Sequence, residues 1–354
     1  MTRSPIVHQF TAVLAERDAL GRHTLAVDDL LREMGAQTQI YATHVHAEVR
    51  DRGRDFREHP DDPAPDLIIY QASTGTPVAD YVASRSEPTV LSYHNMTPAI
   101  FFDMWEPAVA AELDHGRRQL ARLCRKASSG IAVSEYNAAE LRDLGLDHVD
   151  VAPVLFNPLG SDGDAPDAFD GATLLFVGRV SPNKCQQDLV GVLVALHDRG
   201  IAARLVLVGG ASSTGYHDAV VELAARMGVA DSVVFAGSVS ESELVGWYGA
   251  ADVFVSASEH EGFCVPVVEA MSLGVPVVAF GSSAIPETVR DAGLVLADKS
   301  AAVMVEAIDR VLTDATVRDA MIERGRARAA ALGPPASVRR MRDVLQPLLV
   351  GAGS

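Results

Sequence analysis

The chain repeats one pattern twice: short apolar segments rich in Val, Ile and Leu alternate with longer stretches of helical periodicity. The first series is PIVHQF, TQIYA, DLIIYQ, TVLSYHN, SGIAVS and VDVAP. The second series is TLLFVG, RLVLVGG, VVFAG, DVFVSAS, VPVVAF and GLVLA. Strands that alternate with helices are typical of parallel α/β sheets. The sequence therefore predicts an α/β protein with two Rossmann-like domains in tandem.

A Gly-, Pro- and Asp-rich stretch, FNPLGSDGDAPDAFDG, separates the two series and is typical of a hinge. We predict a first domain over residues 1–155, a hinge over 156–171 and a second domain over 172–332. The remaining residues, 333–354, contain apolar positions at helical spacing, and we expect a helix that crosses back to brace the first domain. Open α/β sheets bind ligands at the carboxyl ends of their strands, so two such domains are expected to face each other across a substrate cleft.

The charge excludes one class of partner. A formal net charge of -17 repels nucleic acid, although a local basic pocket can still hold a small anion. The cysteines Cys124, Cys185 and Cys264 form no CxxC pair, so neither a disulfide framework nor a zinc site is indicated. The N-terminal residues lack the apolar core of a signal peptide, and no run is apolar enough to span a membrane. We expect a cytoplasmic location; the sequence indicates no particular oligomeric state.

The segment GRVSPNK follows the first strand of the second series. Arg179 lies at the carboxyl end of that strand, and Lys184 is predicted in the first turn of the next helix, after Ser181 as N-cap and Pro182. Because a helix start prefers anions, a lysine there needs compensation, which a bound phosphate would supply. A solvated surface pair of cations is the alternative.

The segment SEHEGFCVPVVEAM contains two glutamates. Glu261 is predicted in the loop that leaves a strand, and Glu269 on the helix that begins near Pro266. Gly262 allows the loop to turn the backbone N–H groups of the next three residues, Phe263, Cys264 and Val265, toward a diphosphate. The carboxylates are then better placed as acceptors for hydroxyl groups at its two ends. The alternative is that Glu261 is exposed and Glu269 stabilises the helix start.

These segments, with AIPETV and the run from VVFAG to VPVVAF, resemble retaining glycosyltransferase family 4, which has the GT-B fold. The resemblance covers the second domain and includes the family's E-x7-E element. It implies that Arg179 and Lys184 contact the diphosphate of a nucleotide sugar, that Glu261 contacts the donor sugar and that Glu269 contacts the ribose. It also implies that Gly237 and Ser238 line the base. Cys264 departs from the family, where many members have glycine, and this leaves the choice of donor sugar open.

In the first domain, the resemblance implies that Gly21, before an amphipathic helix, approaches the donor phosphates, with His23 nearby. It also relates LSYHNMTP to the family's H-N-x-T-P element, in which His94, Asn95 and Thr97 face the donor sugar. Taken alone, a single glycine there is more often a turn and a single histidine more often structural.

The helical segment 115–127 carries five basic residues around a short apolar face. A basic amphipathic helix can contact anionic lipid, but the face is short and lacks aromatic residues. We therefore favour a helix packed on the core with a solvated basic side.

The resulting hypothesis is a retaining glycosyltransferase that moves a hexose from a UDP- or GDP-sugar to a hydroxyl of a small-molecule, saccharide or glycolipid acceptor. No cofactor or metal is expected, because Arg179, Lys184 and backbone N–H groups suit the charge on the leaving nucleotide, and no DxD-type carboxylate pair stands in a suitable context. His94 is expected to orient the sugar. A nucleotide-sugar epimerase and a non-catalytic nucleotide-sugar-binding protein remain alternatives. A dehydrogenase is disfavoured because LVLVGGASSTG is not a G-x-G-x-x-G turn.

Overall fold

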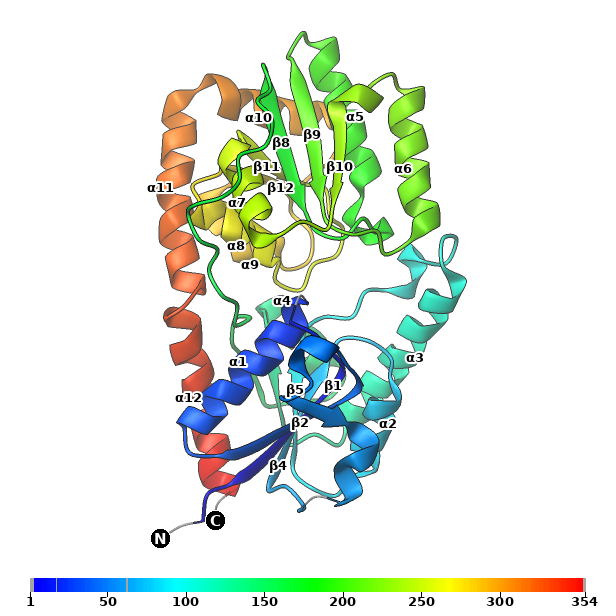
Figure 1. The fold of residues 1–354 in the computed structure, drawn as a ribbon, viewed down its shortest axis with the longest axis vertical. Coiled ribbons are helices and arrows are strands. Elements are labelled where there is room, and N and C mark those ends of the chain that lie inside the picture. The colour runs from blue at the N-terminus through cyan, green and yellow to red at the C-terminus, as the bar shows by residue number, and fades with distance from the viewer. Residues whose placement is uncertain (1–2, 17, 62, 353–354) are drawn as a thin grey trace. The chain divides into compact units, whose positions relative to one another are not determined.

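A computed structural model describes residues 3–16, 18–61 and 63–352 of the chain (Figure 1). The described residues form two compact units. The first unit draws on 1–100, 108–157 and 333–354, and the second on 101–107 and 158–332. In this division the short segment 101–107 groups with the second unit, and residues 156–171, predicted as a hinge, are divided between the two units after residue 157.

The first unit is built on a parallel sheet with strand order β3-β2-β1-β4-β5-β6-β7. Its strands are β1 Ile6–Leu14, β2 Gln37–Val45, β3 Gly53–Asp55, β4 Leu67–Ala72, β5 Thr89–Tyr93, β6 Ser129–Ala132 and β7 Val149–Val151. Its α-helices are α1 Ala19–Glu33, α2 Pro77–Ser84, α3 Pro107–Cys124, α4 Glu135–Asp143 and α12 Ala336–Ala352, and its short 3₁₀ turns are η1 Ala47–Val49, η2 Phe56–Asp61 and η3 Ala99–Phe101. Every residue of β4 and β5 is buried, as expected for central strands with helices on both faces.

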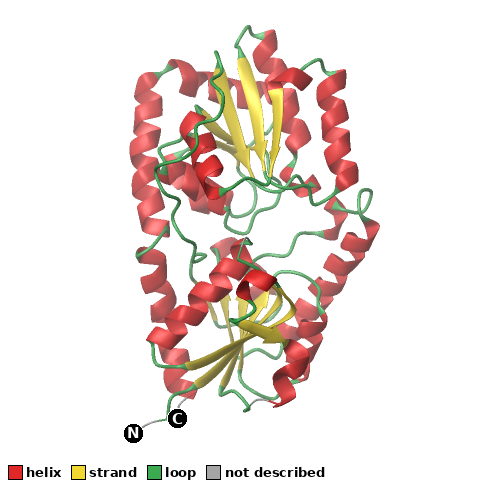
Figure 2. Ribbon diagram, viewed as in Figure 1, coloured by secondary structure: helices red, strands yellow, loops and turns green. Residues whose placement is uncertain are grey.

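The second unit has a parallel sheet with strand order β10-β9-β8-β11-β12-β13. Its strands are β8 Ala172–Val177, β9 Ala203–Val208, β10 Val233–Gly237, β11 Val253–Ser256, β12 Val277–Phe280 and β13 Leu294–Leu296. Its α-helices are α5 Gln186–Asp198, α6 Thr214–Arg226, α7 Glu241–Ala250, α8 Val265–Ser272, α9 Ile285–Val289, α10 Ala301–Thr313 and α11 Ala315–Leu332. The 3₁₀ turns are η4 Pro182–Lys184, η5 Ala230–Ser232 and η6 Arg290–Ala292. Within each unit, helices lie on both faces of the sheet (Figure 2).

The C-terminal helix α12 packs on the first unit, beside α1 (Figure 1). Met341, Val344 and Leu345 are buried in the same apolar cluster as Val27 and Leu31 of α1. On the solvent side, Arg342 pairs with Glu33 at 2.9 Å, and Arg340 pairs with Asp150 at 3.0 Å. Apolar side chains of α12 therefore contribute to the core of the first unit.

Every apolar segment of the two predicted series forms a strand, and the fold class is confirmed. The strand that the sequence did not indicate is β3, at the edge of the first sheet. It has only three residues, two of them charged, and it forms because it pairs in register with Ile40, Tyr41 and Ala42 of β2. Local sequence carries little information about such a strand, since pairing with its neighbour stabilises it.

The basic helix α3 packs its apolar face on the core, with Leu120, Leu123 and Cys124 buried. Its basic side is partly engaged by protein groups. Arg117 pairs with Glu140 at 2.6 Å, and the Lys126 ammonium, just after the helix, donates to the Ala83 carbonyl oxygen at 2.8 Å.

Candidate functional site

Two loops meet at the carboxyl edge of the second sheet. One leaves β8 and carries Arg179 and Lys184, and the other leaves β11 and carries Glu261. Strands β8 and β11 are parallel neighbours, so their carboxyl ends lie side by side. Arg179 is exposed, and its guanidinium makes no hydrogen bond or ion pair with another described residue.

The first of these loops corrects one prediction. Lys184 does not lie in the first turn of the following α-helix, because the left-handed residue Cys185 (φ 55°) separates the 3₁₀ turn η4 from α5. Ser181 does not cap the turn with its side chain; its hydroxyl donates instead to Asn183 Oδ1 at 2.6 Å. Lys184 therefore does not oppose the dipole of α5 as predicted. Its positive charge is instead neutralised by another side chain.

That side chain is Glu261. The Lys184 Nζ lies 2.6 Å from Glu261 Oε1, and the two side chains are only 18% and 8% exposed. The alternative of an exposed Glu261 is wrong. A buried ion pair is favourable only when its geometry is good and its remaining polar atoms have partners, so the surrounding loops have to hold both groups in place.

Two residues that the sequence did not single out hold the loops together. The Asn183 side chain donates from Nδ2 to the main-chain carbonyl oxygen of His260 at 3.2 Å. The main-chain carbonyl oxygen of Asn183 accepts from the Glu259 N–H at 2.9 Å. On the other side of the loop, Ser283 Oγ accepts from the Glu261 N–H at 2.9 Å. Asn183 is part of the segment GRVSPNK, but its contacts with residues 259 and 260 are distant in the sequence and could not be predicted from that segment.

Helix α8 begins at Val265, with Pro266 in its first turn, as predicted. Glu269 is buried on this helix and accepts a hydrogen bond at 2.9 Å from the hydroxyl of Tyr248 on α7. Burial and the neighbouring Glu269 carboxylate raise the pKa of Tyr248 well above its usual value, so the phenol keeps its proton and remains the donor. Tyr248 was not predicted, because its distance from Glu269 in the sequence hides the contact.

The loop between the two glutamates presents unused N–H groups. Among the described residues, the N–H groups of Phe263, Cys264 and Val265 donate to no other residue. The Phe263 carbonyl accepts from the Thr288 hydroxyl at 2.9 Å, which fixes the peptide that precedes Cys264. Cys264 adopts a left-handed conformation, with φ 67° and ψ 71°. Burial and the Glu261 carboxylate raise the pKa of the Cys264 thiol, which is therefore neutral at pH 7.

Left-handed backbone at residues other than glycine concentrates in these loops. The described examples are Asn95, Cys185, Cys264, Ser283 and Arg290. All except Arg290 lie in or beside the loops that carry predicted site residues or hold them. Such conformations cost about 1–3 kcal/mol each and persist where the surrounding structure imposes them. Their concentration therefore marks these loops as structurally constrained.

Gly237 ends β10 at the same edge of the second sheet, with φ 66°. Its carbonyl accepts from the Gly209 N–H at 2.8 Å, and Ser238 follows it at the surface. A side chain at Gly209 would press to 2.2 Å from the Gly178 carbonyl oxygen, so these loops approach each other as backbone. Gly237 and Ser238 thus share the edge of Arg179 and Glu261 but follow a strand two positions away from β8.

In the first unit, His94 directly follows β5 and is half-buried. Its Nε2 lies 2.8 Å from Gln71 Oε1 and 3.1 Å from the Ser92 hydroxyl. The Gln71 amide in turn donates to Gln9 Oε1 at 2.9 Å. Because the Gln71 oxygen is the group that faces the ring, His94 Nε2 carries the proton and Nδ1 is left as an acceptor. Burial and the neighbouring His23 lower the pKa of His94 well below its usual value.

His23 lies on α1 and is fully buried, with its ring centroid 4.6 Å from that of His94. Its Nδ1 accepts from the Leu155 N–H at 2.9 Å, and its Nε2 has no hydrogen-bond partner among the described residues. Burial lowers the pKa of His23 to about 3, so the ring is neutral at pH 7. The structure therefore places His23 in contact with His94 within the core of this unit.

Gly21 lies in the first turn of α1, where Asp18 caps the helix by accepting from the Gly21 N–H at 3.2 Å. An added Cβ at Gly21 would lie 1.9 Å from the Ala15 carbonyl oxygen, so only glycine allows α1 to begin this close to the end of β1. Asn95 and Thr97 follow His94, and the Asn95 side chain accepts from the Met96 N–H at 3.0 Å. These first-unit residues lie at or near the carboxyl edge of their own sheet.

Within residues 3–16, 18–61 and 63–352, no group of three or more His, Cys, Asp or Glu side chains is arranged to hold a metal ion. In the same part of the chain, no helix combines the length and the apolar character needed to cross a membrane.

Comparison with known proteins finds a family model that matches most of the second unit. Residues 167–328 match the family model of glycosyl transferases group 1. The D-inositol 3-phosphate glycosyltransferase of Frankia alni is 34% identical over 193 residues, which are 51% of this chain and 47% of that protein. The GDP-mannose-dependent alpha-(1-6)-phosphatidylinositol monomannoside mannosyltransferase of Mycobacterium tuberculosis is 35% identical over 164 residues, 44% of this chain and 41% of that protein. The chain thus spans less than half the length of these two relatives.

Solved structures match the chain over almost its whole length. A sucrose-phosphate synthase from Thermosynechococcus elongatus superposes with a TM-score of 0.78 at 18% identity, covering 98% of this chain and all of that one. HepE from Anabaena, solved in complex with UDP-glucose, superposes with a TM-score of 0.76 at 17% identity, covering 97% and 99%. At such identities the likeness concerns the fold. The chain therefore has the GT-B fold of two Rossmann-like domains, and its residues 167–328 carry the sequence pattern of glycosyl transferases group 1.

Proposed function

We propose that the chain is a retaining glycosyltransferase of family 4 that transfers a hexose from a UDP- or GDP-sugar to the hydroxyl of an acceptor. The observation that carries the proposal is the composition of the second-unit edge. There, the exposed Arg179, the Lys184–Glu261 pair and the unused N–H groups of residues 263–265 lie in two loops that hydrogen bonds join. A nucleoside diphosphate needs cations and N–H donors for its phosphates and carboxylates for its sugar hydroxyls, and the edge supplies both.

In the proposed reaction, the bond between the anomeric carbon and the diphosphate oxygen breaks and a bond to the acceptor oxygen forms on the same face. The acceptor proton passes to the leaving phosphate oxygen. Arg179, Lys184 and the N–H groups of residues 263–265 stabilise the negative charge that develops on the diphosphate. Glu261 binds hydroxyls of the donor sugar, and the Tyr248-held Glu269 binds the ribose. His94 orients the sugar through its unprotonated Nδ1.

Lys184 is engaged by Glu261 at 2.6 Å, so under this proposal it has two tasks. It orients Glu261, and its remaining N–H groups are available to a phosphate oxygen, since an ammonium has three donors. Arg179 has no such internal task. Substitution of Lys184 would therefore affect both the stability of the site and ligand binding, whereas substitution of Arg179 would affect ligand binding alone. Arg179 is for this reason the better residue for testing function.

The test has two stages. Thermal-shift titration with UDP, GDP, ADP and their common sugars identifies the nucleotide, because a ligand that binds only the folded state raises the melting temperature. Donor turnover is then compared between wild type, Arg179→Ala and the control Arg226→Ala, an exposed arginine of α6 with the same change of charge. We expect Arg179→Ala to lower turnover on the order of tenfold to several hundredfold, as for a lost charged hydrogen bond, with an unchanged melting temperature.

Equal turnover in both variants would refute the assignment of Arg179. Conversion of the donor to an epimer without acceptor would favour an epimerase, and nucleotide binding with neither transfer nor hydrolysis would favour a binding protein. Metal independence is tested in the same assay, where we expect turnover to be unaffected by EDTA. The configuration of the product, read by NMR, tests retention.

A further inference from the structure

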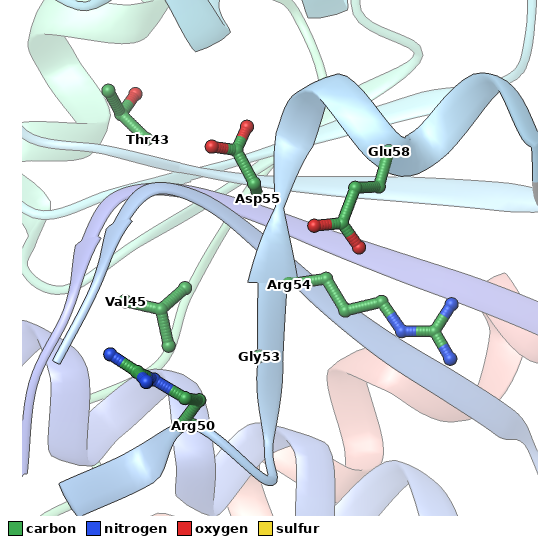
Figure 3. A pocket seen from close by; sticks show the side chains of 7 residues that line it. All are labelled: Thr43, Val45, Arg50, Gly53, Arg54, Asp55 and Glu58. Atoms are coloured by element: carbon green, nitrogen blue, oxygen red, sulfur yellow. The ribbon is translucent and has the colours of Figure 1, made fainter. Parts of the chain in front are cut away.

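The first unit contains a hollow of about 430 Å³ at the carboxyl ends of β2 and β3 (Figure 3). Thr43 and Val45 of β2 line it together with Gly53, Arg54 and Asp55 of β3. Arg50, from the end of η1, and Glu58, from η2, reach the same hollow. Its volume lies in the range of small-molecule sites, and the carboxyl edge of a parallel sheet is where such folds bind ligands.

The charges around the hollow are unevenly used. Among the arginines of residues 50–57, Arg52 pairs with Asp28 at 3.0 Å, and Arg57 donates to Asp55 at 2.9 Å. Arg50 and Glu58 line the hollow, yet neither side chain makes an ion pair or hydrogen bond with another described residue. Arg54 and Asp55 also line the hollow but already have partners, so Arg50 and Glu58 are its cation and carboxylate whose side chains are not engaged by another described residue.

This pairing of groups suits a particular ligand chemistry. A guanidinium binds phosphate or carboxylate, whereas a carboxylate beside it repels an inorganic anion and instead accepts hydrogen bonds from hydroxyl groups. The Thr43 hydroxyl, 3.2 Å from that of Thr76, adds a further polar group, and Val45 adds an apolar surface for a sugar ring. A ligand that satisfies all of them carries both an anionic group and several hydroxyls.

The position of the hollow in the sheet also constrains the length of the ligand. Strand β2 is separated from β5, which His94 follows, by β1 and β4. Three steps between neighbouring strands amount to about 14 Å. If the acceptor hydroxyl reacts near His94, as the proposed function requires, then the group held in the hollow is not the sugar ring that reacts.

We propose that this hollow binds an anionic sugar unit of an extended acceptor, with Arg50 holding its phosphate or carboxylate and Glu58 its hydroxyls. That the ligand is an acceptor follows only if the proposed glycosyl transfer is correct. The chemistry of the ligand, an anionic sugar, is inferred from the residues of the hollow alone. Gly53 lines the hollow, and a Cβ there would lie 2.6 Å from Leu14 Cδ2, so a side chain at this position would require Leu14 to move.

The test is a saturation-transfer NMR titration of the full chain with glucose 6-phosphate, glucuronate, glucose and inorganic phosphate. Wild type, Arg50→Gln, Glu58→Gln and the control Arg226→Gln are compared. We expect Arg50→Gln to weaken binding of glucose 6-phosphate and glucuronate about threefold to tenfold and to leave glucose unchanged, the size expected for an exposed ion pair. Glu58→Gln should weaken all three sugars by less. Stronger binding of glucose 6-phosphate than of glucuronate identifies a phosphate as the anion, and the reverse identifies a carboxylate.

Inorganic phosphate that binds as tightly as glucose 6-phosphate, or equal affinities in Arg50→Gln and Arg226→Gln, would overturn the proposal. The UDP and GDP thermal shifts are recorded on the same variants and should not change. If Arg50-dependent sugar binding is found but no nucleotide binds, the proposed function fails and the anionic-sugar site stands. If nucleotides bind and transfer occurs while sugars ignore Arg50, the site fails alone.

Discussion

The carboxyl edges of the two sheets occupy the same topological position in their units but are organised by different forces. In the second unit, a buried ion pair between Lys184 and Glu261 lies at the centre of the edge. In the first unit, the corresponding centre is neutral: His23 and His94 are held uncharged, and Gln71 fixes the His94 ring through its amide oxygen. The centre of the second edge is thus charged and held by an ion pair, whereas the centre of the first edge is neutral and held by directional hydrogen bonds, with the charged Arg50 and Glu58 lying farther along that edge.

The difference shows how one fold can serve two purposes. A charged edge with unused N–H groups suits a ligand whose charge is fixed, such as a diphosphate. A neutral centre, such as that formed by His23 and His94, can offer hydrogen bonds to hydroxyl groups without itself attracting or repelling a charged part of the same ligand. The two edges should therefore respond differently to loss of a charge, to acid and to a change of backbone freedom.

The largest effect is expected from removing one member of the ion pair. Lys184→Met leaves the Glu261 carboxylate buried without its partner, which costs about 3 kcal/mol, and it removes a cation from the proposed diphosphate site. The double variant Lys184→Met/Glu261→Gln should recover most of that stability, because it replaces the pair by neutral groups, but it should not recover turnover. Melting temperature and donor turnover are measured on wild type, Lys184→Met and the double variant.

A comparison variant is Lys299→Met, which breaks the ion pairs of Lys299 with Asp188 (2.6 Å) and with Glu259 in the same unit. It should lower the melting temperature while costing less turnover than Lys184→Met. A double variant that is no more stable than Lys184→Met would show that the pair is not the organising interaction of this edge.

The sequence predicted the elements that present the second edge better than the contacts that organise it. GRVSPNK and SEHEGFCVPVVEAM each contain local signals, and the helix beginning at Val265 was found from Pro266. The pairing of Lys184 with Glu261 joins residues 77 apart, and the hydrogen bond from Leu155 to His23 joins residues 132 apart. Such contacts depend on the sheet topology and carry no local pattern. Strand β3, and with it the hollow, was missed for the same reason.

A second, intermediate effect is expected from acid at the neutral edge. Burial lowers the pKa of His23 to about 3, whereas an unfolded histidine titrates near 6.5. Between these values the unfolded chain binds a proton that the folded chain does not, so stability is fully present above pH 6.5 and is lost as the pH falls toward 3. The expected contribution is about 1.4 kcal/mol per pH unit. His94, whose pKa is also lowered, acts in the same direction.

The pH dependence of the melting temperature between pH 7.5 and 5 checks this in wild type and in His23→Gln, which cannot take up the proton. We expect a shallower loss in His23→Gln. His115→Gln, at an exposed histidine of α3, is the control and should follow wild type. Parallel curves for wild type and His23→Gln would mean that the neutral histidine is not what distinguishes the first edge.

The smallest effect concerns the backbone, and it sharpens the comparison because the same substitution can be made at both edges. Cys264 is left-handed with φ 67° and uses no side-chain hydrogen bond to cap α8, so Cys264→Gly relieves strain of about 1 kcal/mol and adds a comparable entropic cost. Asn95 is left-handed with φ 78°, but its side chain accepts from the Met96 N–H at 3.0 Å, and asparagine tolerates this conformation better than most residues. We therefore expect Cys264→Gly to leave the melting temperature unchanged or slightly raised, and Asn95→Gly to lower it by the loss of about 1 kcal/mol. A fall in melting temperature of the same size in both variants would show that the Cys264 side chain, like that of Asn95, stabilises its loop. The second edge would then depend on more than the Lys184–Glu261 ion pair.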